Sequence, residues 1–212
     1  MRRTRAEAMA TRAKILESAL DIFSEKAYAS TSLTEIAQNV GFSKGALYWH
    51  FKNKSDLLIQ LVDHLCREGE ETFKSAFEGP VHHGSLSDYY KEVLSRPLTD
   101  SRYKKIHALM LRRSEWPPEL KETIQKLLRD AFERDVKQIK EIVDKGKENG
   151  TIRSEINSTT LAELISSLFR GLFMLQLNGN LSSRYEEYVD FLFDAFEKEI
   201  SAEEKSLPAT SV

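Results

Sequence analysis

Apolar residues recur at steps of three and four along almost the whole chain, which is the period of a helix packed on one side. The clearest stripe, near the amino terminus, consists of Ile15, Leu16, Ala19, Leu20 and Phe23. The alternating pattern of strands, bounded by turn residues, is absent from the sequence. We therefore predict an all-α fold of about nine helices.

Helix boundaries follow from capping residues and from glycine and proline. The stretch "GPVHHGS" predicts a loop, and the paired prolines of "SEWPPEL" interrupt the body and begin the next helix. The tail at 203–212 has the composition of a disordered segment. The expected helices cover about 8–26, 33–40, 44–50, 55–78, 86–96, 101–114, 118–148, 158–178 and 183–201.

Two short helices around Gly41 have the layout of a helix-turn-helix. Ser32 and Glu35 have the spacing of a capping box, so one helix begins after Ser32. Gly41 permits a left-handed backbone in the turn, and Ser43 can cap the helix that starts at Lys44. With about three residues between them, the two helices should cross at a large angle.

The second of these helices is predicted to have a buried side and an outward side. Leu47 and Phe51 lie one turn apart and should pack on the preceding helices. The side chains left to face outward are those of Lys44, Ala46, Tyr48, Trp49 and His50. Core packing of Tyr48 and Trp49 is the alternative, because large aromatic side chains at helical spacing usually belong to a core.

Charge is distributed unevenly along a chain whose net charge is −2. Residues 1–54 contain nine Lys and Arg against five Asp and Glu, a net +4, and the remainder carries 22 basic and 28 acidic residues, a net −6. A basic head on an acidic body suits a protein of which only the head touches DNA phosphates. We therefore divide the chain into a DNA-binding head at 1–54 and a body at 55–202.

Several classes of protein are disfavoured by what the sequence lacks. The single cysteine, Cys66, cannot form an internal disulfide, which indicates a reducing compartment, and no segment is apolar enough to span a membrane. A glycine-rich phosphate loop, histidines at metal spacing on a helix and a nucleophile with a base are all missing. We expect a cytoplasmic protein that is not an enzyme and uses no cofactor or metal; a helical scaffold or adaptor without DNA binding is the alternative.

The stretch "TSLTEIAQNVGFSKGALYWHFKNKSDLL", preceded by "ILESALDIFSEKAY", resembles the DNA-binding head of the TetR family of bacterial transcriptional repressors. The resemblance covers about residues 9–58, and "GTIRSEIN" in the body is similar to the subgroup that regulates multidrug efflux. One departure is Ala27, where the family usually has a glycine that ends the first helix in a left-handed conformation. The first helix is therefore expected to end differently here.

The resemblance implies a ligand-responsive repressor that binds a palindromic operator in double-stranded DNA as a homodimer and is released by a small hydrophobic inducer. Lys44 would donate to guanine O6 and N7, and Ala46 would meet a thymine methyl group. The positions that match base-facing residues are Lys44, Gly45, Ala46 and Tyr48. The positions that match phosphate contacts are Thr31, Ser32, Thr34, Trp49, His50 and Lys54.

For the body, the resemblance implies an inducer pocket among the middle helices and a dimer interface on the last two. The candidate pocket residues are His107, Met110, Leu111, Trp116, Phe169, Phe173 and Met174. The candidate interface residues are Leu161, Leu164, Leu168, Leu172, Tyr188, Leu192 and Phe196, because the helix at 158–178 is apolar around much of its circumference. Ordinary core packing is the alternative for each pocket residue.

Overall fold

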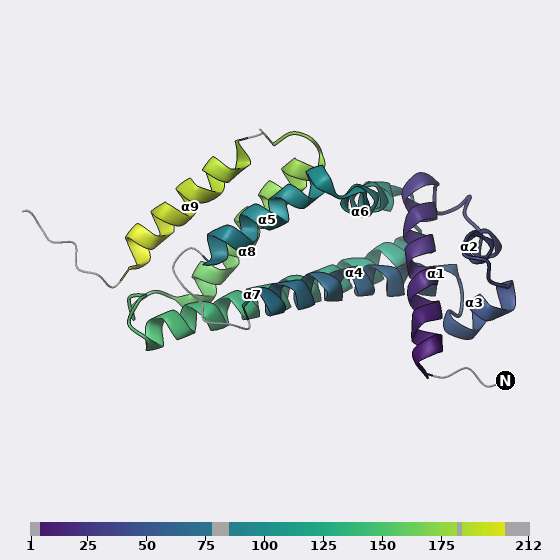
Figure 1. The fold of residues 1–212 in the computed structure, drawn as a ribbon, viewed down its shortest axis with the longest axis horizontal. Helices are drawn as coiled ribbons and strands as arrows, with labels where there is room; N and C mark the ends of the chain where they lie inside the picture. The colour runs from purple at the N-terminus through teal and green to yellow at the C-terminus, as the bar shows by residue number, and fades with distance from the viewer. Residues whose placement is uncertain (1–4, 78–84, 182–183, 202–212) are drawn as a thin grey trace, which may run out of the picture. The chain divides into compact units, whose positions relative to one another are not determined.

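A computed structural model describes residues 5–77, 85–181 and 184–201 of the 212-residue chain. Over these residues the chain forms nine α-helices and one 3-10 turn without a strand, so the predicted all-α fold is confirmed (Figure 1). The elements are α1 (Arg5–Glu25), α2 (Leu33–Asn39), α3 (Lys44–His50), α4 (Lys54–Ala76), α5 (Ser85–Thr99), α6 (Ser101–Leu111), η1 (Arg112–Glu115), α7 (Pro118–Glu148), α8 (Ser158–Leu177) and α9 (Tyr185–Ile200).

The chain divides into two compact units, and α4, α5 and α7 each contribute to both. The first unit contains residues 1–72 and 96–131, and the second contains residues 73–95 and 132–212. The predicted boundary between head and body, at residue 54, does not coincide with these packing units, which are interleaved in sequence. The tail predicted to be disordered, at 203–212, lies outside the described residues.

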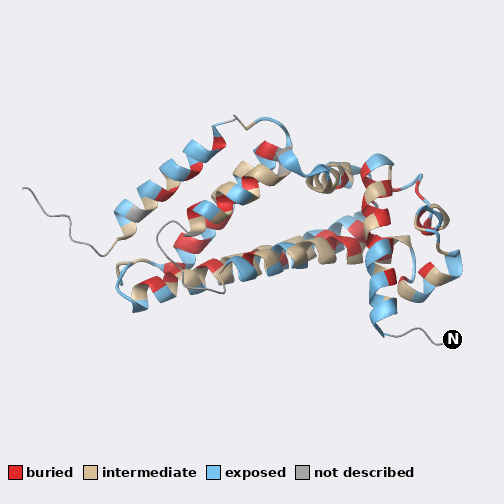
Figure 2. Cartoon of the chain, in the orientation of Figure 1, coloured by how far each residue is buried: buried red, intermediate tan, exposed pale blue. Residues whose placement is uncertain are grey.

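The first unit is organised around the apolar stripe of α1. Ile15, Leu16 and Leu20 are fully buried, and buried residues recur along α1 in Figure 2. They share one core with residues of α2, α3, α4 and α6, including Leu47 and Phe51. At about 25 cal/mol for each Å² of apolar surface buried, a fully buried leucine or phenylalanine contributes roughly 1.5–3 kcal/mol. The predicted inward side of α3 is therefore what fixes α3 to the unit.

The second unit has an aromatic core between α5, α8 and α9. The rings of Tyr90 and Phe169 stack with centroids 3.8 Å apart and planes 11° from parallel, and Phe193 stacks on Phe169 at 5.3 Å. The consecutive helices α7 and α8 are joined by Asp135 and Arg170, whose carboxylate and guanidinium approach to 3.0 Å. Aliphatic residues of α7 and α8 complete the same core.

Asparagine side chains cap the starts of α4 and α8. The Asn53 side-chain oxygen accepts from the amide of Asp56, whose carboxylate accepts from the amide of residue 52. Asn157 caps α8 by accepting from the amide of residue 160. The helix predicted from about residue 55 thus begins one residue earlier, a usual shift, and the helix predicted from 158 begins as expected.

The end of α1 agrees with the expectation for Ala27. No non-glycine residue in the described ranges has a positive φ, so Ala27 does not adopt the left-handed conformation that glycine favours. The chain leaves α1 through turns instead, with the amide of Ser30 donating to the carbonyl of Ala27. Gly41, by contrast, has φ +69°, the left-handed conformation that a glycine in the turn between α2 and α3 was predicted to permit.

Candidate nucleic-acid interface

A serine is the N-cap of each of the two short helices α2 and α3. The Ser32 hydroxyl accepts from the amide of Glu35 at 3.1 Å, and the Ser43 hydroxyl accepts from the amide of Ala46 at 3.2 Å. Each cap satisfies one of the amides left free at a helix start and so fixes where the helix begins. The Glu35 carboxylate of the predicted capping box pairs with Lys26. The hydrogen bond from Lys26 lowers the pKa of Glu35, and a hydrogen bond from the Ser32 backbone also contributes to lowering it.

The outward side of α3 carries one cation and two large aromatic rings. Trp49 is 74% exposed and Tyr48 is 47% exposed, so neither is a core residue. The Lys44 ammonium lies 5.6 Å from the centroid of the Tyr48 ring, and the Trp49 ring meets His50 edge to face at 4.7 Å. Exposed aromatic rings beside a cation form a surface that has no packing role within the first unit.

The remaining base-facing candidates leave room for a close approach. Gly45 is exposed, and a Cβ built there would have only the Ser43 hydroxyl nearby, at 3.8 Å. Ala46 is half-buried beside it. The backbone at the start of α3 is therefore accessible, with small side chains at two successive positions.

At the start of α2, the phosphate candidates have different environments. Ser32 is exposed and Thr34 is half-buried. Thr31 is only 3% exposed, and its hydroxyl donates to the carbonyl of Ala27 at 3.1 Å. This geometry favours a structural role for Thr31 over the phosphate contact expected from the sequence.

Lys54, another predicted phosphate contact, is also hydrogen-bonded within the protein, to backbone carbonyls of the loop between α1 and α2. Its ammonium donates to the carbonyls of Tyr28 at 2.6 Å and Thr31 at 2.8 Å, with a longer contact to Ala29, and it lies 4.4 Å from the centroid of the Tyr28 ring. Burial lowers the pKa of this ammonium. The Tyr28 hydroxyl also meets the Ser55 hydroxyl at 2.7 Å. Lys54 therefore attaches the start of α4 to the loop before α2. Because an ammonium group has only three N–H donors, these bonds compete with the predicted contact to a phosphate.

Replacing Lys54 with methionine is expected to lower the free energy of unfolding by about 1–3 kcal/mol, because the loop carbonyls lose a charged donor. Urea denaturation measures this loss, and Lys52→Met, at an exposed neighbouring position, is the matched control. Unchanged stability, together with a salt dependence of DNA binding reduced by about one phosphate contact, would instead support the phosphate role.

The sequence of the head matches a known family. The model of the bacterial regulatory proteins of the tetR family matches residues 15–61, which include the second half of α1, all of α2 and α3 and the start of α4. The capped pair of short helices and the glycine turn described above fall inside this match. The chain belongs to the TetR family. As a member of the TetR family it carries a DNA-binding helix-turn-helix of the kind found in transcriptional regulators.

Full-length comparisons extend the likeness beyond the head of this TetR-family chain. The transcriptional regulator TtgR of Pseudomonas putida is 27% identical over 198 residues, covering 90% of this chain and 93% of TtgR. NalD of Pseudomonas aeruginosa, described as the secondary repressor of a multidrug efflux pump, aligns with a TM-score of 0.68 at 20% identity, over 93% of this chain and 98% of NalD. SmeT in complex with triclosan aligns with a TM-score of 0.67 at 19% identity, over 95% of this chain and 96% of SmeT. The two structures show that the fold is shared along nearly the whole chain.

Two apolar stripes remain exposed on the last two helices. On α8 they include Leu164 and Leu175, and on α9 Tyr188 and Phe191, of which Phe191 is 74% exposed. Among the predicted interface residues, Leu161 is buried in the core of the second unit, and four are half-buried: Leu168, Leu172, Leu192 and Phe196. Phe191 was not among the predicted interface residues, although its three-residue step from Tyr188 is a signal that could have identified it.

The predicted pocket residues are divided between the two units. In the first unit, Trp116 belongs to the core, Leu111 is exposed, and His107 has a buried Nε2 with no hydrogen-bond partner among the described residues. In the second unit, Phe169 is a core residue of the aromatic stack. The half-buried positions are Met110 and Phe173, and Met174 is exposed.

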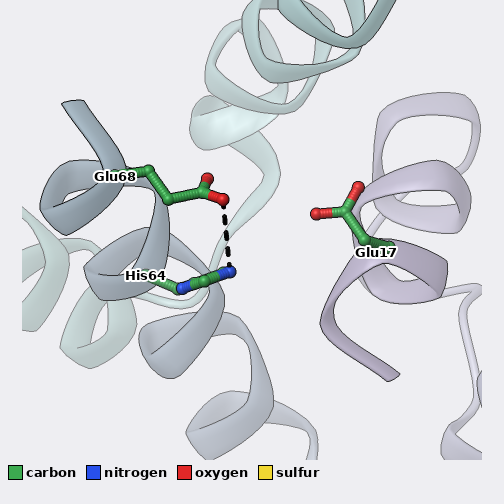
Figure 3. Close-up of side chains that lie close together, drawn as sticks. All are labelled: Glu17, His64 and Glu68. Atoms are coloured by element: carbon green, nitrogen blue, oxygen red, sulfur yellow. Dashed lines mark ion pairs between the residues drawn. The ribbon is translucent and has the colours of Figure 1, made fainter. Parts of the chain in front are cut away.

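One cluster of carboxylates and a histidine, in the first unit, has atoms close enough together to be considered for a metal ion. Figure 3 shows Glu17 on α1 opposite His64 and Glu68 on α4, and within the described residues their ligand atoms lie within 4.8 Å of one another. Arg102 on α6 already supplies a cation, since its guanidinium donates to Glu17 at 2.8 Å and to Glu68 at 2.7 Å. The hydrogen bond that Arg102 donates to Glu17 raises the pKa of Arg102, so the positive charge is held there. The cluster is an ion-pair network between three helices.

Two further contacts continue this network along α1. Lys105 on α6 pairs with Asp21 at 2.7 Å, and Arg112 donates to the carbonyls of Ser24 at 3.2 Å and Glu25 at 3.1 Å. The basic side of α6 and η1 is therefore attached to the last two turns of α1.

Among the helices described here, none is both long and apolar enough to cross a bilayer.

Proposed function

We propose that the chain is a ligand-responsive transcriptional repressor that binds a palindromic operator as a homodimer and is released by a small hydrophobic inducer. The observation that carries the proposal is the outward side of α3, where Lys44 and two exposed aromatic rings flank a capped helix start. A recognition helix presents its first residues to base edges in the major groove, and hydroxyls and cations around it meet phosphates. This side has the residue types that both tasks need.

The proposed contacts follow the exposure of each side chain. Base edges would be met by Lys44, Gly45, Ala46 and Tyr48, and phosphates by Ser32, Thr34, Trp49 and His50. Thr31 and Lys54 would act indirectly, by holding the loop before α2 in position. The free amides at the start of α2 and α3 favour anionic groups nearby.

The exposed stripes of α8 and α9 support the homodimer. Leu164, Leu175, Tyr188 and Phe191 present apolar surface on two neighbouring helices of the second unit, and surface of this kind is costly to leave in water. Pairing with the same two helices of a second copy would bury it in a four-helix bundle with two-fold symmetry. Such a dimer would hold two recognition helices at one spacing, which is what a palindrome requires.

Release by an inducer requires a connection between the body and the head, and α6 offers one. Arg102, Lys105 and Arg112 attach α6 and η1 to α1, the helix on which α2 and α3 pack. An inducer that prefers one position of α6 would change the position of α1 and so the population of the DNA-binding form. Binding of inducer and operator would then oppose each other. No step of this scheme needs a cofactor, and it would take place in the cytoplasm.

Replacing Lys44 with alanine is expected to weaken operator binding by about 1–3 kcal/mol and to relax the preference for one base in each half-site. Fluorescence anisotropy with a selected inverted repeat and its single-base variants measures both effects. The matched control is Lys104→Ala, which removes an exposed lysine of the same unit on α6 and should leave binding unchanged.

The same titrations separate the proposal from its rivals. Equal losses on all DNA sequences for Lys44→Ala would remove the base contact from the proposal. Absence of binding by the unchanged protein to any inverted repeat at low salt would instead favour a helical scaffold or adaptor.

A further inference from the structure

In the second unit, the later part of α7 runs antiparallel to α8. They are consecutive in the chain, and the ion pair of Asp135 and Arg170 joins a point 13 residues before the end of α7 to a point 12 residues after the start of α8. The Arg170 guanidinium also lies 4.9 Å from the centroid of the Phe132 ring. This pair fixes the register in which residues of the two helices oppose each other.

About one helical turn from this ion pair, two side-chain polar atoms are buried without a hydrogen-bond partner. Gln138 follows Asp135 by three residues and Ser166 precedes Arg170 by four, so both lie about one turn from the ion pair at nearly the same level. Over the described residues, the Gln138 Oε1 and the Ser166 hydroxyl have no hydrogen-bond partner, and Ser166 is 93% buried. A buried polar group without a partner costs free energy, and in native proteins such groups are few and call for an explanation.

The surroundings of these atoms are aromatic. Phe169 follows Ser166 on the same side of α8 and stacks on Tyr90 and Phe193. The charges of Asp135 and Arg170 both act on the Tyr90 hydroxyl, whose pKa is raised mainly by burial, so Tyr90 also lies near this turn. Two unsatisfied polar atoms thus lie beside a stack of flat apolar rings, which is the composition of a small-molecule site.

We propose that Gln138 and Ser166 are the polar anchors of the inducer site and that the inducer is an aromatic compound with a hydroxyl on the ring. This inference rests on the proposed function and gives the ligand a chemical class. The Gln138 Oε1 can only accept, whereas the serine hydroxyl can also donate. One phenolic hydroxyl would donate to Gln138 and accept from Ser166, while its ring joins the aromatic stack. An apolar compound without that hydroxyl would leave both atoms unsatisfied.

The test compares two probes that differ in one hydrogen-bond donor, 4-butylphenol and 4-butylanisole. Calorimetry on the full-length protein should show that the phenol binds at least about 10-fold more tightly, since a site built to bond a hydroxyl discriminates against the analogue that cannot donate. In Gln138→Met with Ser166→Ala, the phenol should lose this advantage while the anisole keeps its affinity. Ser167→Ala, which removes an exposed hydroxyl next in sequence, is the matched control and should keep the preference for the phenol.

A second measurement excludes a merely structural role. Without ligand, the double variant should unfold at a temperature at least about 2 °C higher, because two unsatisfied buried groups are replaced by apolar ones of similar shape. A lower unfolding temperature would show that the two groups are satisfied and support the fold, and it would overturn the proposal. An equal affinity of the unchanged protein for both probes, or no binding of either, would overturn it as well.

Failure of this inference can be told apart from failure of the proposed function. Operator binding, and its release by an apolar compound, are measured on the same preparations by anisotropy. If operator binding and release persist while the two probes are not distinguished, only the anchors are wrong. If the protein binds no operator, the proposed function fails first.

Discussion

Replacing Phe191 with glutamate is expected to convert the proposed homodimer to a monomer and to weaken binding of a two-half-site operator by at least about 100-fold. Phe191 is the most exposed large apolar side chain of α9. In a dimer bundle it would be enclosed by the partner's helices, where an ionised carboxylate without a partner is strongly destabilising. Loss of the dimer removes the gain in affinity that comes from holding two recognition helices together.

Analytical ultracentrifugation measures the first effect and anisotropy on a full palindrome the second. Met9→Glu is the control for sedimentation, because it places the same charge at an exposed methionine of α1. Affinity for a single half-site should be unchanged in Phe191→Glu, since α3 belongs to the other packing unit. A dimer that persists in this variant would place the interface elsewhere on the molecule.

Replacing Leu47 with alanine is expected to lower the free energy of unfolding of the first unit by about 2–5 kcal/mol. Leu47 is fully buried and belongs to the same core as Ile36 and Phe51, so its removal leaves a cavity beneath the recognition helix. Because native domains are stable by only about 5–15 kcal/mol, DNA binding should also become sensitive to temperature.

Urea denaturation measures the effect, and Trp49→Ala on the same helix is the matched control. Trp49 is exposed, so its loss should change stability by no more than about 0.5 kcal/mol while weakening DNA binding. Equal destabilisation by the two variants would mean that Trp49 packs against the unit, and its proposed phosphate contact would have to be withdrawn.

The elements of the head were predictable because local signals agree there. Ser43, Gly41 and the step from Leu47 to Phe51 all mark the same short helix, and α3 begins and ends at the predicted residues. Capping and hydrophobic period act over a few residues, so the sequence contains them directly. Consistency among such signals is what allows boundaries to be read without coordinates.

The role of Lys54 was not predictable in this way. Its carbonyl partners on Tyr28 and Thr31 lie 26 and 23 residues earlier, and nothing near Lys54 in the sequence marks them. A lysine after a recognition helix is equally suited to a phosphate and to a row of carbonyls. Only the folded arrangement of α4 against the loop before α2 separates the two.

Candidate ligand residues were even harder to predict from the sequence, because an apolar side chain has the same sequence signal in a core and in a pocket. Trp116, named as a pocket candidate, belongs to the core of the first unit, and Phe169, which belongs to the core of the second, also borders the proposed ligand site. Gln138 and Ser166 were not considered, since polar residues in an amphipathic helix ordinarily face water. It is their burial without partners that distinguishes them, and burial is a property of the packed helices.

Transplanting the head onto the body of another regulator would cut the attachment between α1 and α6. A junction at residue 54 separates Glu17 and Asp21 from Arg102 and Lys105, and it leaves carboxylates on the donor without the bases that neutralise them. A working hybrid would need a recipient whose sixth helix presents bases at the same spacing. Under the proposed function, operator choice and inducer response would therefore be transferred together, and changing one of them would require redesign of the contact between α1 and α6.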